Sequence, residues 1–528
     1  MPVLSSEEAM TTNDPTSSIG AIAYEAAIAE LQAAMESGAI SAEALTMACL
    51  ERIEALNRAG PCLNAVIDVS PSALETAIVL DTERDARGPR SPLHGIPILL
   101  KDNIDTLDDT VTTAGSLALL GSRPATEATV VARLRAAGAV ILGKANMSEW
   151  ANFRSTSSSS GWSARGGQAR NPHVLARSPC GSSSGSAIAV AASMCVAAIG
   201  TETDGSISCP SALCGVVGIK PTVGLTSRAG VIPISFTQDT VGPHARCVAD
   251  AATVLGIIAG PDPRDPATAA AAGHVRPDYR TCLQADALRG ARIGVLRSDR
   301  FAGFGRHVER ALAAAVAAMA EAGAHIVDPV KLPEELLAFS ETELTVLLYE
   351  FKATLNRYLA ERIPDPQAAT PAPRSLAELI AFNEQHAERE LLFFGQELLL
   401  QAAAVGDLDD QAYQQALAAS RDEARKALDT VLYELQLDAL VALATGLAWP
   451  IDLIGGDRYL GGSSSLPARA GYPIVTVPAG MAFGLPIGIN FIGGAWSEPM
   501  LIRLAYAFEQ ATRFRQPPAY RERIVGDE

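Results

Sequence analysis

Residues 95–103 read GIPILLKDN, and this stretch indicates both the class of fold and the chemistry that the rest of the chain has to support. The apolar run from Ile96 to Leu100 follows Gly95 and is typical of one buried strand in an α/β sheet. Such a strand delivers Lys101 at its end. A lysine keeps its proton in neutral water, but burial lowers its pKa and can make it a base.

Two serines lie downstream of this lysine, separated by 24 positions. Ser182 belongs to GSSSGS at residues 181–186, and Ser206 belongs to TDGSI at residues 203–207. A serine hydroxyl is a weak nucleophile until a base removes its proton. Lys101, Ser182 and Ser206 can therefore supply base, relay and nucleophile without a histidine.

The turn that contains Ser206 is suited to bind a developing negative charge. Gly205 permits a turn in which the N–H groups of Thr203, Asp204, Gly205 and Ser206 converge on one point. We therefore predict an oxyanion hole here. The loop at residues 181–186 runs into the apolar segment Ala187–Ala198, which predicts a buried helix of about three turns whose N-terminus faces the site.

Together these segments resemble the amidase signature family of serine hydrolases, and the resemblance covers residues 25–515. It implies that Ser206 is the acylated nucleophile, that Ser182 is a bridging serine after a cis peptide bond, and that Lys101 is the base. It also implies the amidase-signature fold. Two positions depart from the broader family pattern, since Asp204 stands where many members have glycine and Ser208 where many have arginine.

Four segments are most similar to the bacterial peptide amidase branch, whose members remove the C-terminal amide of peptides. These segments are residues 148–154, 161–168, 178–181 and 200–205. By this resemblance the substrate is a peptide amide or a small-molecule amide, and Asn152 and Trp162 are candidate substrate-binding residues. The serine-rich run Ser155–Gly161, which lies between two of these segments, is a candidate rim of the pocket.

Composition excludes several partners. The formal charge of −17 opposes binding to a phosphate backbone, so we expect no nucleic acid. The seven histidines and eight cysteines show no metal-ligand spacing, and no nucleotide-binding glycine motif occurs, so we expect neither a metal nor another cofactor. The oligomeric state stays open.

The cysteines and the N-terminus indicate the compartment. The eight cysteines are scattered without a C-x-x-C pair, which favours free thiols in a reducing compartment over disulfides. Residues 1–18 are polar and have no apolar stretch typical of a signal peptide, and no membrane anchor is visible. We therefore expect a disordered segment at residues 1–18 and a cytoplasmic protein that binds no membrane.

The pattern of apolar segments predicts one α/β amidase domain over residues 19–528. Strand-like runs at 96–100, 139–142, 197–200 and 293–296 alternate with helices such as 127–137, which favours a mixed, largely parallel central sheet covered by helices on both faces. A helical pair is expected at 20–58, interrupted near Gly38. Residues 300–435 have helical spacing and form an expected helical insertion, after which strands at 439–443, 474–478 and 487–492 and a helix at 500–512 complete the fold.

A different nucleophile is also considered. Residues 181–185 contain the G-x-S-x-G pattern of α/β-hydrolases, centred on Ser183. That mechanism needs a histidine downstream, at the end of a strand. Of the five histidines after Ser183, four lie in helix-like or polar segments, so this interpretation is disfavoured.

Other functions remain open beside peptide amide hydrolysis. The chain could hydrolyse aryl or aliphatic amides or carbamates, or serve as the glutaminase subunit of a transamidation complex, in which case the purified chain alone would be nearly inactive. A catalytically silent scaffold is disfavoured because Lys101, Ser182 and Ser206 are all present.

Overall fold

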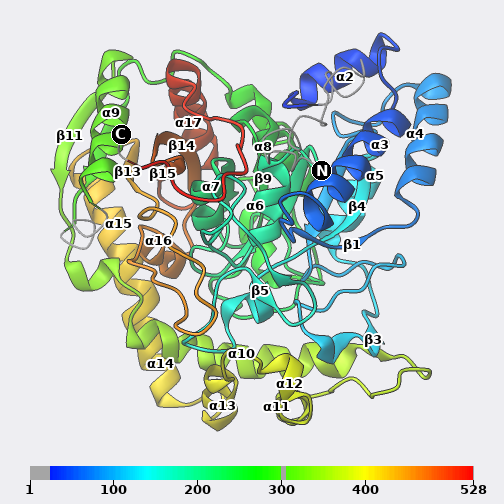
Figure 1. Cartoon of the computed structure of the whole chain (residues 1–528). Coiled ribbons are helices and arrows are strands. Elements are labelled where there is room, and N and C mark those ends of the chain that lie inside the picture. The colour runs from blue at the N-terminus through cyan, green and yellow to red at the C-terminus, as the bar shows by residue number, and fades with distance from the viewer. Residues whose placement is uncertain (1–23, 299–304, 527–528) are drawn as a thin grey trace, which may run out of the picture.

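The fold is built around an eleven-stranded sheet, shown in the computed structural model of Figure 1. The structure describes residues 24–298 and 305–526, and the segment 1–18 that we expect to be disordered lies outside them. The strand order is β1-β4-β2-β7-β9-β8-β14-β15-β13-β10-β11. The strands are β1 (Val66–Val69), β2 (Pro97–Lys101), β4 (Val140–Ala145), β7 (Ala197–Glu202), β8 (Val217–Lys220), β9 (Thr240–Ala245), β10 (Arg292–Leu296), β11 (His325–Val330), β13 (Ala439–Leu443), β14 (Ile474–Ala482) and β15 (Leu485–Ile492).

Neighbouring strands pair in both directions. Parallel pairs join β4, β2 and β7 in one flank of the sheet and β13, β10 and β11 in the other. Between these flanks all pairs from β7 to β13 are antiparallel, and β1 is antiparallel at the edge. The expected mixed α/β sheet is confirmed, with its parallel pairs in the flanks and antiparallel pairs in the centre.

Helices flank this sheet. The predicted N-terminal pair is confirmed as α2 (Ile28–Glu36) and α3 (Ala42–Ile53), which lie on either side of Gly38. Helix α4 (Ala73–Arg87) packs against α3. Further helices pack on the sheet or on one another: α5 (Thr129–Ala136), α6 (Ser184–Ala191), α7 (Ser208–Cys214), α8 (Val248–Ile258), α16 (Ser465–Ala470) and α17 (Glu498–Thr512). No helix within the described ranges is both long and apolar enough to cross a membrane.

Helix α6 corrects one prediction. The expected helix over Ala187–Ala198 instead begins at Ser184 and ends at Ala191, and β7 starts at Ala197. The backbone reverses between them, and Ser193 adopts a positive φ of 53°. Because every residue of this segment is buried, its apolar pattern is continuous and contains no signal for the end of the helix.

The segment expected to be a helical insertion begins later than predicted. Helix α9 (Arg306–Glu321) leads into β11, which pairs in parallel with β10 and is the last strand of the sheet. Strand β10, helix α9 and strand β11 therefore belong to the α/β core as a strand–helix–strand unit. Strand β11 contains Pro329 and is mostly exposed or half-buried, so it lacks the apolar run that identifies the other strands.

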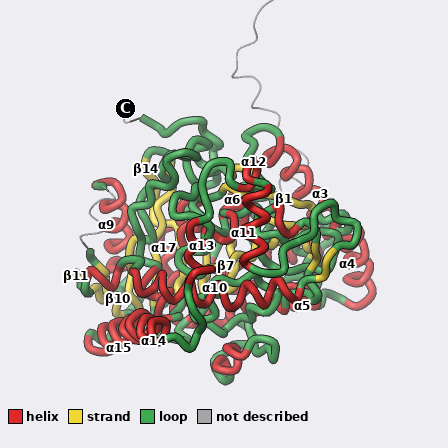
Figure 2. Tube along the Cα trace, turned by 90° about the horizontal axis from the view of Figure 1, so that it is seen from below, coloured by secondary structure: helices red, strands yellow, loops and turns green. Residues whose placement is uncertain are grey.

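A predominantly helical segment follows from Glu334 to Glu434. It comprises a short 3₁₀ helix (Glu334–Leu337), α10 (Glu341–Glu361), α11 (Leu376–Gln385), α12 (Ala387–Glu390), α13 (Glu397–Ala404), α14 (Gln411–Leu417), a π-helical turn (Ala418–Asp422) and α15 (Glu423–Glu434). Figure 1 shows α10 to α14 together at the bottom of the view, and Figure 2, seen from below, shows α10, α11 and α13 side by side. This segment also pairs β12 (Ile363–Pro364) with β3 (Ser122–Arg123).

A buried charge cluster joins this helical segment to the core. Arg154 Nη1 donates to Glu149 Oε1 at 2.6 Å and to the carbonyl of Glu390, the last residue of α12. The guanidinium also lies 4.3 Å from the ring centroid of Phe394. Burial raises the pKa of both carboxyls, so Arg154 is the cation that keeps this cluster close to neutral.

Replacing Arg154 with Met is expected to destabilise the protein by about 3–5 kcal/mol, because the buried carboxylate that it neutralises then lacks a counter-ion. The measurement is the midpoint of urea denaturation followed by circular dichroism. Arg280→Met is the matched control, because Arg280 pairs with Asp278 on the surface and a pair of that kind contributes about 1 kcal/mol or less. Equal losses in the two variants would contradict the assigned role of Arg154.

Candidate active site

A cavity of about 600 Å³ lies beyond the end of β7, against the helical segment. Ser206 is part of its wall, whereas Lys101 and Ser182 are fully buried behind the surface. The lining residues come from several separate parts of the chain: Ala151, Asn152, Phe153, Ser155, Thr156, Ser158, Ser160, Cys180, Gly181, Thr203–Ser206, Cys209, Ile234, Leu337–Phe339, Leu344, Leu347, Leu398, Trp449, Asp457, Tyr459–Gly462 and Ser465.

Lys101 is the last residue of β2, as the sequence predicted. Its Nζ is within hydrogen-bond distance of Ser182 Oγ at 2.7 Å, Thr201 Oγ1 at 2.8 Å and the Thr201 carbonyl at 3.2 Å. Asn103 Nδ2 also donates to Thr201 Oγ1 at 3.0 Å. A neutral amine fits these partners, with two N–H groups donated to Thr201 and its lone pair directed to the Ser182 hydroxyl.

Burial controls the charge of this lysine. Loss of solvent lowers the pKa of Lys101 to about 7, although Asp239 and Glu202 oppose the shift. Neither carboxylate makes a salt bridge with Lys101; Asp239 accepts from Thr203 Oγ1 at 2.6 Å, and Glu202 accepts the N–H groups of residues 207 and 208. The lysine can therefore exchange a proton near neutral pH.

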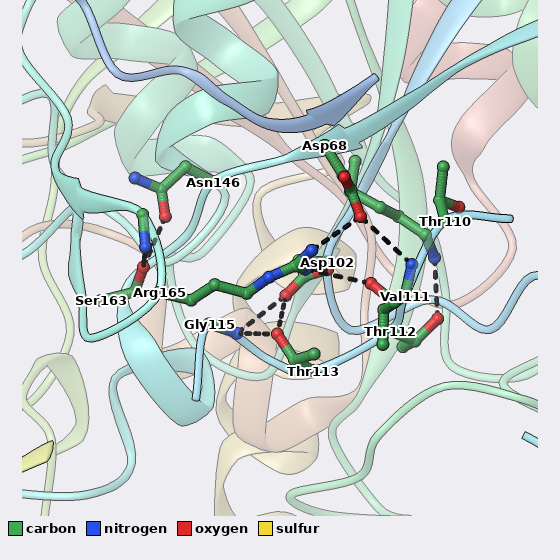
Figure 3. A network of polar contacts seen from close by, with 12 residues as sticks. Asp68, Asp102, Thr110, Val111, Thr112, Thr113, Gly115, Asn146, Ser163 and Arg165 are labelled. Atoms are coloured by element: carbon green, nitrogen blue, oxygen red, sulfur yellow. Dashed lines mark hydrogen bonds and ion pairs between the residues drawn. The ribbon is translucent and has the colours of Figure 1, made fainter. Parts of the chain in front are cut away.

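A polar network holds the chain where it leaves β2 (Figure 3). Asp102 follows Lys101 directly and accepts from the Gly115 N–H at 2.9 Å and from the Thr113 hydroxyl. Arg165 reaches across to Asp102 at 3.3 Å and to Asp68 at 2.6 Å. These contacts fix the residue next to Lys101, so the lysine side chain can stay in one place.

The segment that contains Ser182 is joined to the segment that contains Ser206. The peptide bond between Gly181 and Ser182 is cis, which confirms what the family resemblance implied. The Ser183 N–H donates to the Ser206 carbonyl at 3.2 Å. Ser182 also contacts Lys101, so the segment with Ser206 lies directly beside the Lys101–Ser182 pair.

The turn at residues 203–206 has the donors that an oxyanion needs. Gly205 adopts a positive φ of 79°, as expected for this turn. The N–H groups of Asp204, Gly205 and Ser206 donate to no acceptor within the described part of the chain, and the turn lines the cavity. Unpaired donors at a cavity wall can bind a negative oxygen.

Distant side chains fix this turn, and no sequence pattern indicates them. The Asp204 carboxylate accepts from the hydroxyls of Ser464 at 2.6 Å and Ser465 at 2.7 Å. The Thr203 carbonyl accepts from Gln238 Nε2 at 3.4 Å. Serines 260 positions away in the chain carry no local signal that would reveal this contact.

Ser183 has a different position from that of a nucleophile. It is fully buried and does not line the cavity, and its hydroxyl donates to the Thr201 carbonyl at 3.0 Å. The buried His244 contacts Ser211 at 2.9 Å through Nδ1, and burial lowers its pKa to about 3. The α/β-hydrolase interpretation has no support in this arrangement.

The candidate substrate-binding residues have separate positions. Asn152 lines the cavity and accepts from Ser158 at 2.8 Å, and residues of the serine-rich run also line it. Trp162 does not belong to the lining. Its ring packs against Phe394 at 5.0 Å and under Arg154 at 5.2 Å, and it lines a separate cavity of about 420 Å³.

The expectation that all cysteines are free is wrong for one pair. Cys180 and Cys209 form a disulfide that joins the residue before Gly181 to α7, which follows Ser206. The other six cysteines are free, as expected. The two cysteines are close in the fold, although their spacing in the sequence gives no sign of a pair. The cysteines therefore no longer support the expectation of a reducing, cytoplasmic compartment.

Among the described residues, no group of three or more histidine, cysteine, aspartate or glutamate side chains is arranged to hold a metal. The cavity wall presents hydroxyls, backbone N–H groups and two carboxylates. The chemistry of this arrangement is therefore that of an activated serine beside an oxyanion site.

Similarity to known proteins identifies the family. Residues 44–502 match the Amidase family model. The X-ray structure of native peptide amidase from Stenotrophomonas maltophilia superposes with a TM-score of 0.88 and 53% identity, and covers 94% of this chain and 99% of that chain. A probable amidase of Arabidopsis thaliana is 43% identical over 504 residues, which are 94% of this chain and 92% of that protein.

A third relative is a glutamyl-tRNA(Gln) amidotransferase subunit of Chloroflexus aurantiacus, 37% identical over 492 residues, which are 92% of this chain and 96% of that protein. The fold and the family thus define a hydrolase of carboxamides. The chain belongs to the Amidase family and is an amidase that acts on amide bonds.

Activity should rise with pH through the pKa of Lys101, about 7, because only the neutral amine accepts a proton. Below that pH, kcat/KM is expected to fall by about a factor of ten per pH unit. Lys101→Ala should lower kcat by about 10³-fold. The measurement is ammonia release at pH 5 to 9. Near-normal kcat in Lys101→Arg, which keeps the charge but cannot lose a proton, would contradict the role of base.

Loss of the disulfide should loosen the two segments that contain the catalytic serines. Replacing Cys180 and Cys209 with Ser is expected to cost about 3–4 kcal/mol of stability, from loop-closure entropy over 29 residues, and to lower kcat/KM. Thermal unfolding and turnover are measured with and without dithiothreitol. Dithiothreitol should lower the thermal stability and the turnover of the wild-type protein only. An equal effect on the double-serine variant would show that the reductant does not act through this disulfide.

Proposed function

We propose that this amidase removes the C-terminal amide of peptides through an acyl-enzyme on Ser206. The observation that carries the proposal is the 2.7 Å contact between buried Lys101 and Ser182, beside a Ser206 that faces the cavity. The similarity to peptide amidase supports the substrate class.

The first step moves a proton inward. Ser206 Oγ attacks the amide carbon, Ser182 Oγ receives its proton, and the Ser182 proton passes to neutral Lys101. The Thr201 oxygens hold the resulting ammonium through the contacts described above. The N–H groups of the turn at residues 203–206 bind the oxygen that becomes negative.

The second step reverses the relay. Lys101 returns its proton through Ser182 to the leaving nitrogen, the carbon–nitrogen bond breaks, and ammonia departs. Water then attacks the ester carbonyl on Ser206, gives its proton to the same relay and releases the carboxylic acid product. Ser206 regains its proton, so the site returns to its starting state.

The cavity supports a peptide substrate that one chain binds alone. The helical segment supplies apolar side chains to its wall, such as Leu344, Leu347 and Leu398, in addition to the polar turn at residues 203–206. A volume of about 600 Å³ accommodates the end of a peptide but is larger than an isolated carboxamide needs. These properties favour a self-contained enzyme over a glutaminase subunit that depends on a partner.

The purified chain is therefore expected to convert an amidated peptide to the free acid and to leave its internal bonds intact. Mass spectrometry of the products distinguishes this outcome from internal cleavage. Fast turnover of an aryl amide or carbamate, together with inactivity on every peptide amide, would assign another substrate class. Activity only after addition of a partner protein would support the glutaminase alternative.

Two serine variants test the nucleophile in the same assay. Ser206→Ala should lose nearly all turnover, because no acyl-enzyme can form. Ser183→Ala is the matched control and should retain much of its activity. A serine-directed phosphonate should label Ser206, and labelling of Ser183 with Ser206 unmodified would contradict the proposal.

A further inference from the structure

The charges in the cavity wall are all of one sign. Among its described lining residues are two carboxylates, Asp204 and Asp457, and no lysine, arginine or histidine. Amide hydrolysis converts an uncharged group into a carboxylate inside this same cavity. The wall therefore meets a neutral substrate and an anionic product.

Neither wall carboxylate forms a salt bridge within residues 24–298 and 305–526. Asp204 accepts from the two hydroxyls of Ser464 and Ser465. Asp457 accepts from the Ser160 N–H at 3.0 Å and from Trp449 Nε1 at 2.8 Å. Hydrogen bonds from neutral donors hold a carboxylate in place and leave its net charge unchanged.

Several cations lie close to the lining residues without being part of the lining. Lys101 is fully buried and is neutral in the state that accepts a proton. Lys220 is also fully buried, and its amine donates to the Tyr472 carbonyl at 2.6 Å. Arg469 lies 3.8 Å from Glu343, a buried carboxyl. Arg458 is exposed and lies between the lining residues Asp457 and Tyr459, but it is not part of the lining either. Within the described residues the lining itself therefore contains no cation.

We propose that Asp204 is a specificity-determining residue that excludes free carboxylates from the site. Asp204 lies two positions from Ser206 in the turn that binds the reacting carbonyl, so its charge is close to the group that changes charge. A like charge disfavours an anion strongly where little water screens it.

The same charge does not prevent catalysis. The oxyanion intermediate is covalently attached to Ser206, and three unpaired N–H groups within the described turn are available to it. The free product has lost the covalent bond, so repulsion promotes its release. Peptides with an ordinary C-terminal carboxylate are likewise bound more weakly, so they compete poorly with amidated peptides.

The test compares binding of an amide with binding of its matched acid, without turnover. The Ser206→Ala protein is titrated by calorimetry at pH 8.5 with one N-acetylated tripeptide, first as its C-terminal amide and then as its free acid. We expect the dissociation constant of the acid to be about tenfold that of the amide, or larger. Asp204→Asn should reduce this ratio of dissociation constants by about tenfold.

Two variants separate charge from structure. Asp452→Asn makes the same change in net charge outside the cavity and should leave the ratio unchanged. Ser464→Ala removes one hydrogen bond to Asp204 but keeps its charge, so the preference for the amide should persist. A ratio near one, or a ratio that responds to Ser464→Ala but not to Asp204→Asn, would overturn the proposal.

The inference rests on the proposed reaction at Ser206 but not on the peptide class. If neither tripeptide binds, the proposed peptide substrate fails, and benzamide and benzoate are titrated in the same way. Preferential binding of benzamide that Asp204→Asn abolishes would still support the exclusion of carboxylates. Equal binding of the two would overturn it.

Discussion

Burial of the Lys101 side chain sets the requirements that the other residues of the site meet. An ammonium group in this position would lose its hydration, and that loss brings its pKa to about 7. The neutral amine then needs partners that suit both of its protonation states, which Thr201 and Ser182 provide. The strand that delivers the lysine, the network beyond it and the cis bond at Ser182 all serve this placement.

The turn at residues 203–206 has the opposite requirement, because its N–H groups have to stay without partners. Ordinary secondary structure therefore cannot hold the turn. Side chains hold it instead: Asp204 through two serines, and Thr203 through Asp239. These contacts also place the Asp204 carboxylate in the cavity wall, and the preference for uncharged substrates that we propose would follow from how the turn is fixed.

Sequence reasoning was most accurate where function depends on adjacent residues. The strand before Lys101 and the Gly205 turn are confirmed because each is encoded within a few positions. The cis bond before Ser182, which only the family resemblance implied, is confirmed as well. It was wrong about the end of α6, where uniform burial removes periodicity, and about β11, where an edge strand lacks an apolar run. Trp162 shares a motif with the site but packs away from the cavity.

The family and the mixed α/β class could be inferred from the sequence, because spacing and local conformation are properties of the chain. The same spacing led to the proposal that Lys101, Ser182 and Ser206 are the catalytic residues. The groups that surround these residues could be found only in the folded molecule. The Cys180–Cys209 bond, the serines that hold Asp204 and the apolar wall from the helical segment all join residues far apart in the chain. Such contacts depend on how the elements pack, and no local pattern records that packing.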